Sequence, residues 1–214
     1  MRRIWNPSPT TLRWKLKPAT HLLALLPLAG LVYGIFNENL GANPVEELTH
    51  ETGEWSLRFL LLSLVITPLR SLTGLVWLTR FRRVLGLYAF FYALCHFVIY
   101  FLLDQSLSLQ LVIEDIVERP YITVGFAAFC LFIPLTLTST AKARRRLKAA
   151  WNRLHKLVYV AGILVLLHFL WLTKADYREP LIYVSIFVLL MLARVYPQVK
   201  TSLAGGREAV RVQE

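Results

Sequence analysis

Three histidines lie inside long apolar segments of this chain, where a polar side chain is costly and therefore a candidate for function. They are His96, His155 and His168. At a rise of about 1.5 Å per residue, His96 is about 20 Å along a helix from Arg83, and His168 is about 22 Å from Arg153. Because both basic residues begin their apolar runs, the sequence predicts His96 and His168 at nearly the same membrane depth.

Two imidazoles at one depth on two helices could hold one metal centre. Zinc normally takes four protein ligands, and no Asp, Glu or Cys pattern completes such a set. Heme iron needs only two axial ligands, because the macrocycle supplies the other four. Aromatic neighbours would suit a porphyrin, lipid or plain helix packing equally: Phe97, Tyr100, Phe101, Phe169 and Trp171. Heme ligation by His96 and His168 therefore stands beside the alternative that each histidine hydrogen-bonds a neighbouring helix.

His155 cannot share a centre with His168. It lies 13 residues earlier, which is about 20 Å lower and roughly 140° around an ideal helix. The equivalent position before His96 is Arg83, so the third helix offers no second histidine. The remaining candidate partner is His21, at the inner edge of the first helix, and an ordinary interfacial histidine is its alternative role. His50 lies among glutamates and is expected to be solvated or to face a partner.

The elements that must position these histidines are transmembrane helices. Hydrophobic residues make up 56% of the 214 residues and charged residues 17%, with a mean hydropathy of +0.52, which is too apolar for a soluble domain. A bilayer crossing takes about 20 apolar residues. Six apolar runs are visible: His21–Phe36, Trp55–Thr67, Val84–Leu103, Tyr121–Leu137, Trp151–Leu172 and Leu181–Val195.

These runs predict an all-α, polytopic membrane protein with a six-helix transmembrane bundle. Residues 1–20 would form a basic arm, residues 21–196 the bundle, and residues 197–214 a flexible tail. The second helix is expected to extend from Val45 to Pro68 and to end there, because proline disrupts a helix interior. The short apolar patch Leu75–Phe81 is expected at the membrane interface. Cys95 and Cys130 lie within apolar runs and are expected to be buried free thiols.

The charge distribution predicts the orientation. Of 24 Lys and Arg residues, 20 lie in residues 2–17, 70–83, 142–156 and 194–211, on one side of the predicted membrane. Eleven of the 13 acidic residues lie on the other side. Cytoplasmic loops retain positive charge, so both termini are expected in the cytoplasm. The net charge of +11 is thus a topology signal and does not indicate nucleic-acid binding.

Several function classes lack support in the sequence. There is no Ser-His-Asp set, HExxH motif or paired carboxylates for hydrolysis, and no G-x-G-x-x-G with a strand pattern for a dinucleotide domain. Electrons for a heme would therefore come from membrane quinol or from a separate cytosolic flavin protein. A small transporter without heme would also explain six helices, but only Arg58 is a plausible intramembrane charge.

The sequence resembles a known family through motifs spread between Lys17 and Tyr196. They are Leu40-Gly41-Ala42-Asn43-Pro44, His50-Glu51-Thr52-Gly53, Ile66-Thr67-Pro68, Arg82-Arg83-Val84-Leu85-Gly86-Leu87, Arg119-Pro120-Tyr121, Thr138-Ser139-Thr140, Leu154-His155-Lys156-Leu157-Val158-Tyr159 and Pro180-Leu181-Ile182-Tyr183. The chain is similar to the heme-binding membrane subunits of bacterial periplasmic methionine sulfoxide reductase systems, the YedZ or MsrQ family. That family is itself similar to the transmembrane part of ferric reductases and NADPH oxidases.

The resemblance implies a b-type cytochrome in the bacterial inner membrane, with one or two hemes b. It would pass electrons from the quinone pool or a cytosolic flavin donor to a periplasmic molybdopterin-containing methionine sulfoxide reductase, without itself reducing the sulfoxide. His96, His155 and His168 match the heme ligands proposed in the family, with which FMN is also associated. Arg83 departs from the two-heme oxidases, which carry histidine there. A stand-alone ferric or quinone reductase is the alternative implied function.

Overall fold

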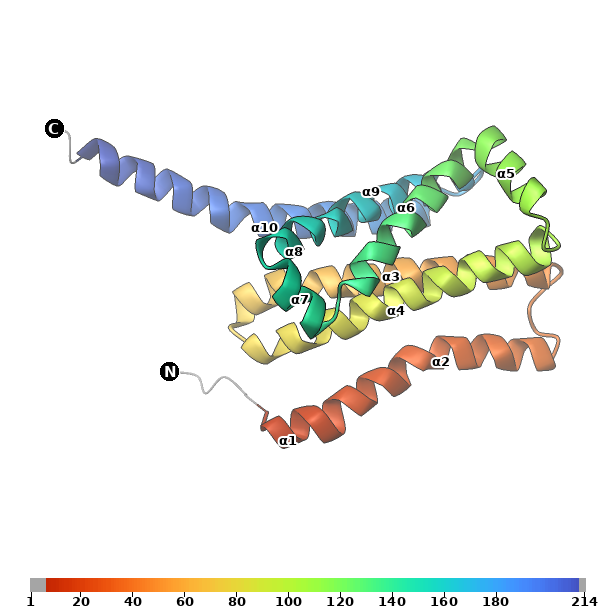
Figure 1. Ribbon diagram of the computed structural model, residues 1–214, viewed down its shortest axis with the longest axis horizontal. Coiled ribbons are helices and arrows are strands. Elements are labelled where there is room, and N and C mark those ends of the chain that lie inside the picture. The colour runs from red at the N-terminus through yellow and green to blue at the C-terminus, as the bar shows by residue number, and fades with distance from the viewer. Residues whose placement is uncertain (1–6, 212–214) are drawn as a thin grey trace.

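The computed structural model describes the backbone of residues 7–211 and the side chains of residues 7–196, and every regular element in that range is a helix (Figure 1). Six helical segments are long and apolar enough to cross a membrane. They are Pro9–Phe36, Pro44–Thr73, Val76–Asp104, Pro120–Leu137, Ala149–Leu172 and Arg178–Tyr196. The expected all-α architecture with six membrane-spanning helices is confirmed.

The helices follow one another with short connections. The first three spans contain α1 (Pro9–Thr11), η1 (Leu12–Leu16) and α2 (Lys17–Phe36), then α3 (Pro44–Thr73), then η2 (Val76–Leu78), α4 (Thr79–Ile99) and η3 (Tyr100–Asp104). The second half contains α5 (Leu109–Glu118), α6 (Pro120–Leu137), α7 (Ala141–Leu147), α8 (Ala149–Leu154), α9 (Leu157–Leu172) and α10 (Arg178–Arg211).

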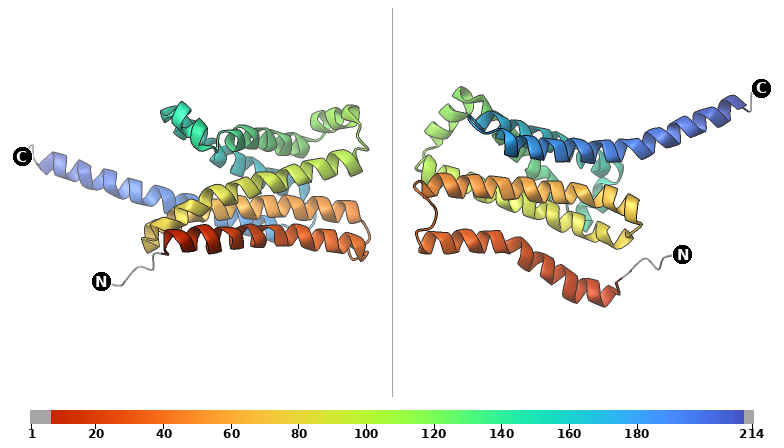
Figure 2. Two further views of the ribbon diagram at one scale, coloured as in Figure 1. Left: turned by 60° about the horizontal axis from the view of Figure 1, so that its bottom comes forward. Right: turned by 180° about the vertical axis from the view of Figure 1, so that it is seen from behind.

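Two helix pairs form the centre of the bundle. α3 packs along α4, and α6 packs along α9. α10 lies against α3 and α9, while α2 lies on the opposite flank of the bundle (Figure 2). Side chains of α3 enter both apolar core clusters, one around Tyr92 and Phe59 and the other around Leu64 and Phe187. α3 is therefore the helix around which the others are arranged.

The prediction that the second helix ends at Pro68 is wrong, because α3 continues to Thr73. Pro68 has no N–H, so the carbonyl of Leu64 loses its partner within the helix. Arg194 on α10 donates a hydrogen bond to that carbonyl. Gly74, with φ of 73° in the left-handed region, then ends α3. A side chain from a distant helix thus allows the proline to lie inside the span.

The helices extend beyond the predicted bundle in both directions along the chain. The first span begins at Pro9 rather than at His21, so most of the basic arm is helical. α10 is helical to Arg211, where the sequence predicts a flexible tail; residues 1–6 and 212–214 lie outside the described residues. The segment after Pro197 contains Leu, Ala, Lys and Glu, which have high helix propensity.

Both cysteines are free, as expected, but Cys130 is exposed on α6 and not buried. Only one face of α6 packs against the bundle, and Cys130 lies outside that face. Cys95 on α4 is partly buried.

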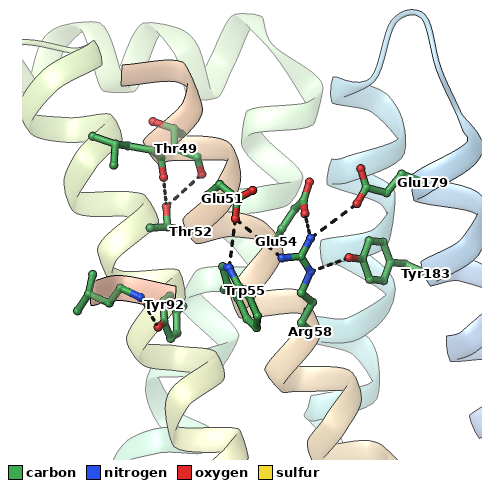
Figure 3. Close-up of polar contacts among 11 residues, drawn as sticks. Thr49, Glu51, Thr52, Glu54, Trp55, Arg58, Tyr92, Glu179 and Tyr183 are labelled. Atoms are coloured by element: carbon green, nitrogen blue, oxygen red, sulfur yellow. Dashed lines mark hydrogen bonds and ion pairs between the residues drawn. The ribbon is translucent and has the colours of Figure 1, made fainter. Parts of the chain in front are cut away.

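Tyr92 joins α4 to α2 through its hydroxyl (Figure 3), at the bend of α2 that Figure 2 shows. Its hydroxyl accepts a hydrogen bond from the Leu28 amide at 3.1 Å and donates one to the Ala24 carbonyl at 2.8 Å. These two groups would bond directly in a regular helix, so the hydroxyl is inserted into the backbone ladder next to Pro27. Insertion of a side chain at a proline is a recognised cause of a helix bend. Tyr92 is completely buried.

The two ends of the bundle differ in their loops. The start of α1, the end of α10 and the α7–α8 segment lie at one end, and α5 lies at the other (Figure 1). The helices alternate in direction, so the loops with few basic residues lie together at the α5 end, which is called the outer end below. Its assignment to the periplasmic side is a prediction from the charge pattern.

Candidate functional site

His96 on α4 and His168 on α9 lie beside each other near the outer end. Their ring centroids are 6.2 Å apart, and the rings are nearly perpendicular, at 81°. Both side chains line one cavity of about 400 Å³, which is called the outer cavity below. The structure therefore brings together the two histidines for which the sequence predicts a common depth.

A neighbouring helix orients each imidazole. Nδ1 of His96 is 2.8 Å from the carbonyl oxygen of Thr49 on α3, and Nδ1 of His168 is 2.7 Å from the carbonyl oxygen of Tyr121 on α6. A carbonyl can only accept, so Nδ1 must carry the proton in both rings. The lone pair of each neutral imidazole is then on Nε2, the nitrogen that remains available as a metal ligand.

Two glycines allow the rings to lie close to the helix backbones. A Cβ atom at Gly53 would lie 3.1 Å from Nδ1 of His96, and one at Gly125 would lie 2.7 Å from Nδ1 of His168. Real Cβ contacts are rarely so short, so a larger residue would displace the ring. Gly53 and Gly125 each lie one helical turn after the carbonyl that holds the ring, and the sequence reasoning missed both roles.

The two helix pairs repeat the same arrangement. Each histidine lies 47 residues after the residue whose carbonyl it contacts. An offset of 72 residues relates several pairs that line the outer cavity: Thr49 and Tyr121, Gly53 and Gly125, Leu57 and Phe129, Ala93 and Val165, His96 and His168, and Phe97 and Phe169. The α3–α4 and α6–α9 pairs are therefore equivalent in their contacts around this cavity. A comparison of the sequence with itself at this offset could have found the two His-Phe dipeptides.

The outer cavity fits a heme better than a bare metal ion. Among the residues that the structure describes, no group of three or more His, Cys, Asp or Glu side chains could hold a metal. Two imidazole ligands are enough for heme iron. Both imidazoles line this one cavity, with ring centroids 6.2 Å apart, so both would be available to one heme. Phe97, Phe129 and Phe169 add aromatic surface to the wall.

A short helix closes the outer end of this cavity. Val112 and Ile116 of α5 line it. Asp115 of α5 accepts hydrogen bonds from the Tyr100 hydroxyl at 2.9 Å and from Nε2 of Gln105 at 2.8 Å. Its ion pair with Arg119, at 3.1 Å, raises the pKa of the guanidinium. Asp115 thus connects α5 to the end of the third span.

His155 lines a second cavity of about 300 Å³ at the opposite end, which is called the inner cavity below. Its ring stacks on Trp151 with centroids 3.9 Å apart, and its Nε2 is 3.0 Å from the Thr138 hydroxyl. The wall includes three arginines: Arg82, Arg83 and Arg144. None of the described residues that line this cavity is acidic. The cavity therefore suits a ligand that carries negative charge.

The 72-residue repeat extends to the inner cavity. It relates Leu60 to Phe132, Ser63 to Leu135, Thr79 to Trp151, Arg83 to His155 and Gly86 to Val158, all of which line that cavity. Arg83 therefore occupies the position in the first helix pair that His155 occupies in the second. His155, for which the sequence offers no histidine partner on the third helix, thus has Arg83 as its counterpart in the structure.

His21 is not placed with His155. Nδ1 of His21 is 2.9 Å from the Tyr88 hydroxyl on α4, and His21 does not line the inner cavity. The first span begins at Pro9, so His21 lies within the span and not at its inner edge. Because α2 lies on the flank of the bundle, the neighbour of His21 is Tyr88 of α4. His50 is exposed and lines the outer cavity.

The known proteins that resemble this chain are a transmembrane family and subunits named as heme-binding. Residues 52–167 match the family described as "Ferric reductase like transmembrane component". The chain is similar to "Protein-methionine-sulfoxide reductase heme-binding subunit MsrQ" of Xanthomonas campestris pv. campestris (strain 8004), with 48% identity over 90% of this chain and 91% of the relative. The similarly named protein of Herminiimonas arsenicoxydans is 44% identical over 90% of this chain and 89% of the relative. No solved structure shows significant similarity to the chain.

Proposed function

Because this chain belongs to the MsrQ family of heme-binding subunits, with a ferric reductase-like transmembrane component, we propose that it carries electrons across the membrane to a methionine sulfoxide reductase. The observation that supports this most directly is the facing pair His96 and His168 in one cavity. The multi-pass architecture supplies a path from one side of the membrane to the other.

In this proposal Nε2 of His96 and Nε2 of His168 would hold a heme b in the outer cavity. The bound heme would supply a one-electron carrier. The carbonyls of Thr49 and Tyr121 hold the two imidazoles in the required tautomer and orientation. Phenylalanine side chains of the wall exclude water from the site, which lowers the local dielectric constant around the carrier.

The inner cavity is proposed as a second cofactor site. His155 is its candidate ligand, and Arg83 lies at the equivalent position of the other helix pair. Arg82 and Arg144 would pair with heme propionates or with the phosphate of an FMN, since arginine binds both groups through charge-assisted hydrogen bonds. A second heme b and an FMN therefore remain the two candidates for this cavity. His21 is not proposed as a ligand because it contacts Tyr88 instead.

The direction of electron flow follows from the predicted topology. Basic loops mark the inner end as cytoplasmic, so electrons would enter there from the quinone pool or a cytosolic flavin reductase. They would leave at the outer end for a periplasmic molybdopterin-containing reductase, which performs the sulfoxide chemistry itself. The proposed location is the bacterial inner membrane, and the proposed role is repair of oxidised periplasmic proteins.

A test begins with the detergent-purified full-length chain. Pyridine hemochrome quantification and a reduced-minus-oxidised spectrum should show b-type heme. The chain is then reconstituted in vesicles with a reduced quinone analogue, and a purified periplasmic methionine sulfoxide reductase is added outside. Sulfoxide reduction that depends on this chain supports the proposal, whereas chain-dependent reduction of ferric chelate without any transfer to the reductase supports the stand-alone ferric reductase. Absence of bound heme would refute both functions.

A further inference from the structure

Arg58 on α3 lies at the centre of a polar cluster inside the membrane-spanning region (Figure 3). Its guanidinium pairs with Glu54 and donates from Nε to the Tyr183 hydroxyl on α10 at 2.8 Å. Glu51 and Glu179 lie 3.9 and 3.8 Å from it. The guanidinium also lies over the Trp55 ring, 4.7 Å from the centroid. Arg58 thus joins α3 to α10 near the outer end, as Arg194 does at Leu64.

The cluster contains more acidic than basic groups. Three carboxylates surround the single guanidinium. Glu54 is the least exposed of them, at 16%, against 35% for Glu51 and 53% for Glu179. Charges that water reaches poorly are screened less and act over longer distances. Glu54 is therefore the carboxylate of this cluster whose charge water screens least.

Glu54 also belongs to the wall of the outer cavity, whereas Arg58, Glu51 and Tyr183 do not. The other charged residues of the wall, Glu46, Asp104 and Arg119, are exposed, and so is His50. Water screens those groups. Among the described carboxylates of the wall, Glu54 is the one that is substantially buried.

The 72-residue repeat shows that the cavity does not need this carboxylate to form. The counterpart of Glu54 is Phe126, which lines the same cavity from α6. The counterpart of Arg58 is Cys130. The second helix pair has uncharged residues at both positions, so the charged pair in the first half is an addition to the shared architecture. It makes the field across the cavity asymmetric.

We propose that Glu54, positioned by Arg58, sets the reduction potential of the redox centre in the outer cavity. A fixed negative charge beside the centre disfavours addition of an electron and so lowers the potential. Arg58 opposes this effect by partial neutralisation and anchors Glu54 through Tyr183 and α10. A lowered potential promotes transfer of the electron to the external acceptor. The inference rests on the proposed heme in this cavity.

The test is a spectroelectrochemical titration of the full-length protein with heme bound. Glu54→Gln removes a negative charge and should shift the midpoint potential of the outer center to more positive values. Arg58→Gln removes a positive charge and should shift it to more negative values. Glu47→Gln makes the same charge change on an exposed part of α3 outside the cavity wall and should shift the midpoint several times less than Glu54→Gln.

Opposite signs distinguish an electrostatic role from general disturbance of the fold. If Glu54→Gln binds heme normally but shifts the midpoint no more than Glu47→Gln does, the inference is wrong. If either Glu54→Gln or Arg58→Gln loses heme, the direction of the midpoint shift in the other variant decides whether the inference holds. Loss of heme in both would show that the cluster is needed for assembly and would reject the inference. Absence of heme from the wild-type protein would instead reject the proposed function.

Discussion

His96 and His168 occupy equivalent positions in two helix pairs that face each other across the outer cavity. Each imidazole donates from Nδ1 to a carbonyl 47 residues earlier in the chain. Each also packs against a glycine one turn beyond that carbonyl. The equivalence means that both rings are fixed in the same way, by backbone groups that no side-chain substitution removes.

Replacement of either histidine of the pair should remove the outer heme. His96→Ala and His168→Ala each delete one proposed axial ligand, so the low-spin b-type signal assigned to the outer cavity should disappear from the reduced-minus-oxidised spectrum. His50→Ala is the matched control, because His50 lines the same cavity but is exposed. Full heme content in His96→Ala would exclude the pair as ligands.

Addition of a methyl group at Gly125 should disturb the site. Its Cβ atom would lie 2.7 Å from Nδ1 of His168, and loss of a group that orients a metal ligand typically costs roughly tenfold to a hundredfold in affinity. We expect Gly125→Ala to weaken heme binding, measured by heme titration, and Gly53→Ala to weaken it less. Gly30→Ala, where nothing lies within 4 Å of the new Cβ atom, should bind heme normally. Equal affinity in all three variants would contradict the role of the glycines.

Loss of the Tyr92 hydroxyl should destabilise the bundle. Tyr92→Phe leaves the Leu28 amide and the Ala24 carbonyl without their shared partner, and an unsatisfied buried polar group costs about 1–3 kcal/mol. Thermal unfolding in detergent should therefore show a lower midpoint. Tyr33→Phe removes the same atom from an exposed tyrosine of α2 and should leave the midpoint unchanged. A similar change in both variants would show that the inserted hydroxyl does not stabilise the bend.

His155 and His21 should differ in their effect on the inner cofactor. His155→Ala should lower the content of the inner heme or FMN, measured by pyridine hemochrome and by flavin fluorescence, without loss of the outer signal. Arg83→Gln should have an effect of the same kind, because Arg83 lines the same cavity. His21→Ala should retain the cofactor, since His21 contacts Tyr88. If His21→Ala lowers the content of the inner cofactor as much as His155→Ala does, the proposed assignment of His155 alone as the inner ligand is wrong.

Neutralisation of exposed outer carboxylates should slow electron delivery to the partner. Glu46, Glu114 and Glu118 are exposed, whereas Glu51 and Glu54 interact with Arg58 and are less free to attract a partner. Exposed charges mainly steer encounter, and salt screens them over about 8 Å at physiological ionic strength. The triple Gln variant should be slower than wild type at low salt, and the difference should shrink as salt rises. If the variant and the wild type have the same turnover at every salt concentration, these charges do not contribute to docking of the partner.

Apolar run length determined the architecture from the sequence alone. A crossing needs a fixed length of apolar chain, so the six spans could be counted without tertiary information. The common depth of His96 and His168 followed from helix rise, since rise is a local property. Helix rise does not determine how each helix is rotated or which helices are neighbours. For this reason the sequence suggested His21 as a partner for His155, although the structure does not place the two together.

The tertiary structure decided the features that depend on groups far apart in the chain. Pro68 predicts a helix end by local rules, but Arg194, 130 residues away from Leu64, binds the free carbonyl and the helix continues. Only packing shows that Gly53 and Gly125 face the imidazoles, or that Glu54 is part of the cavity wall. Local sequence determines the number of spans and the position of each residue along its helix. The rotation and the contacts of each helix depend on the packing of all six spans, because side chains from distant segments compete for the same neighbours.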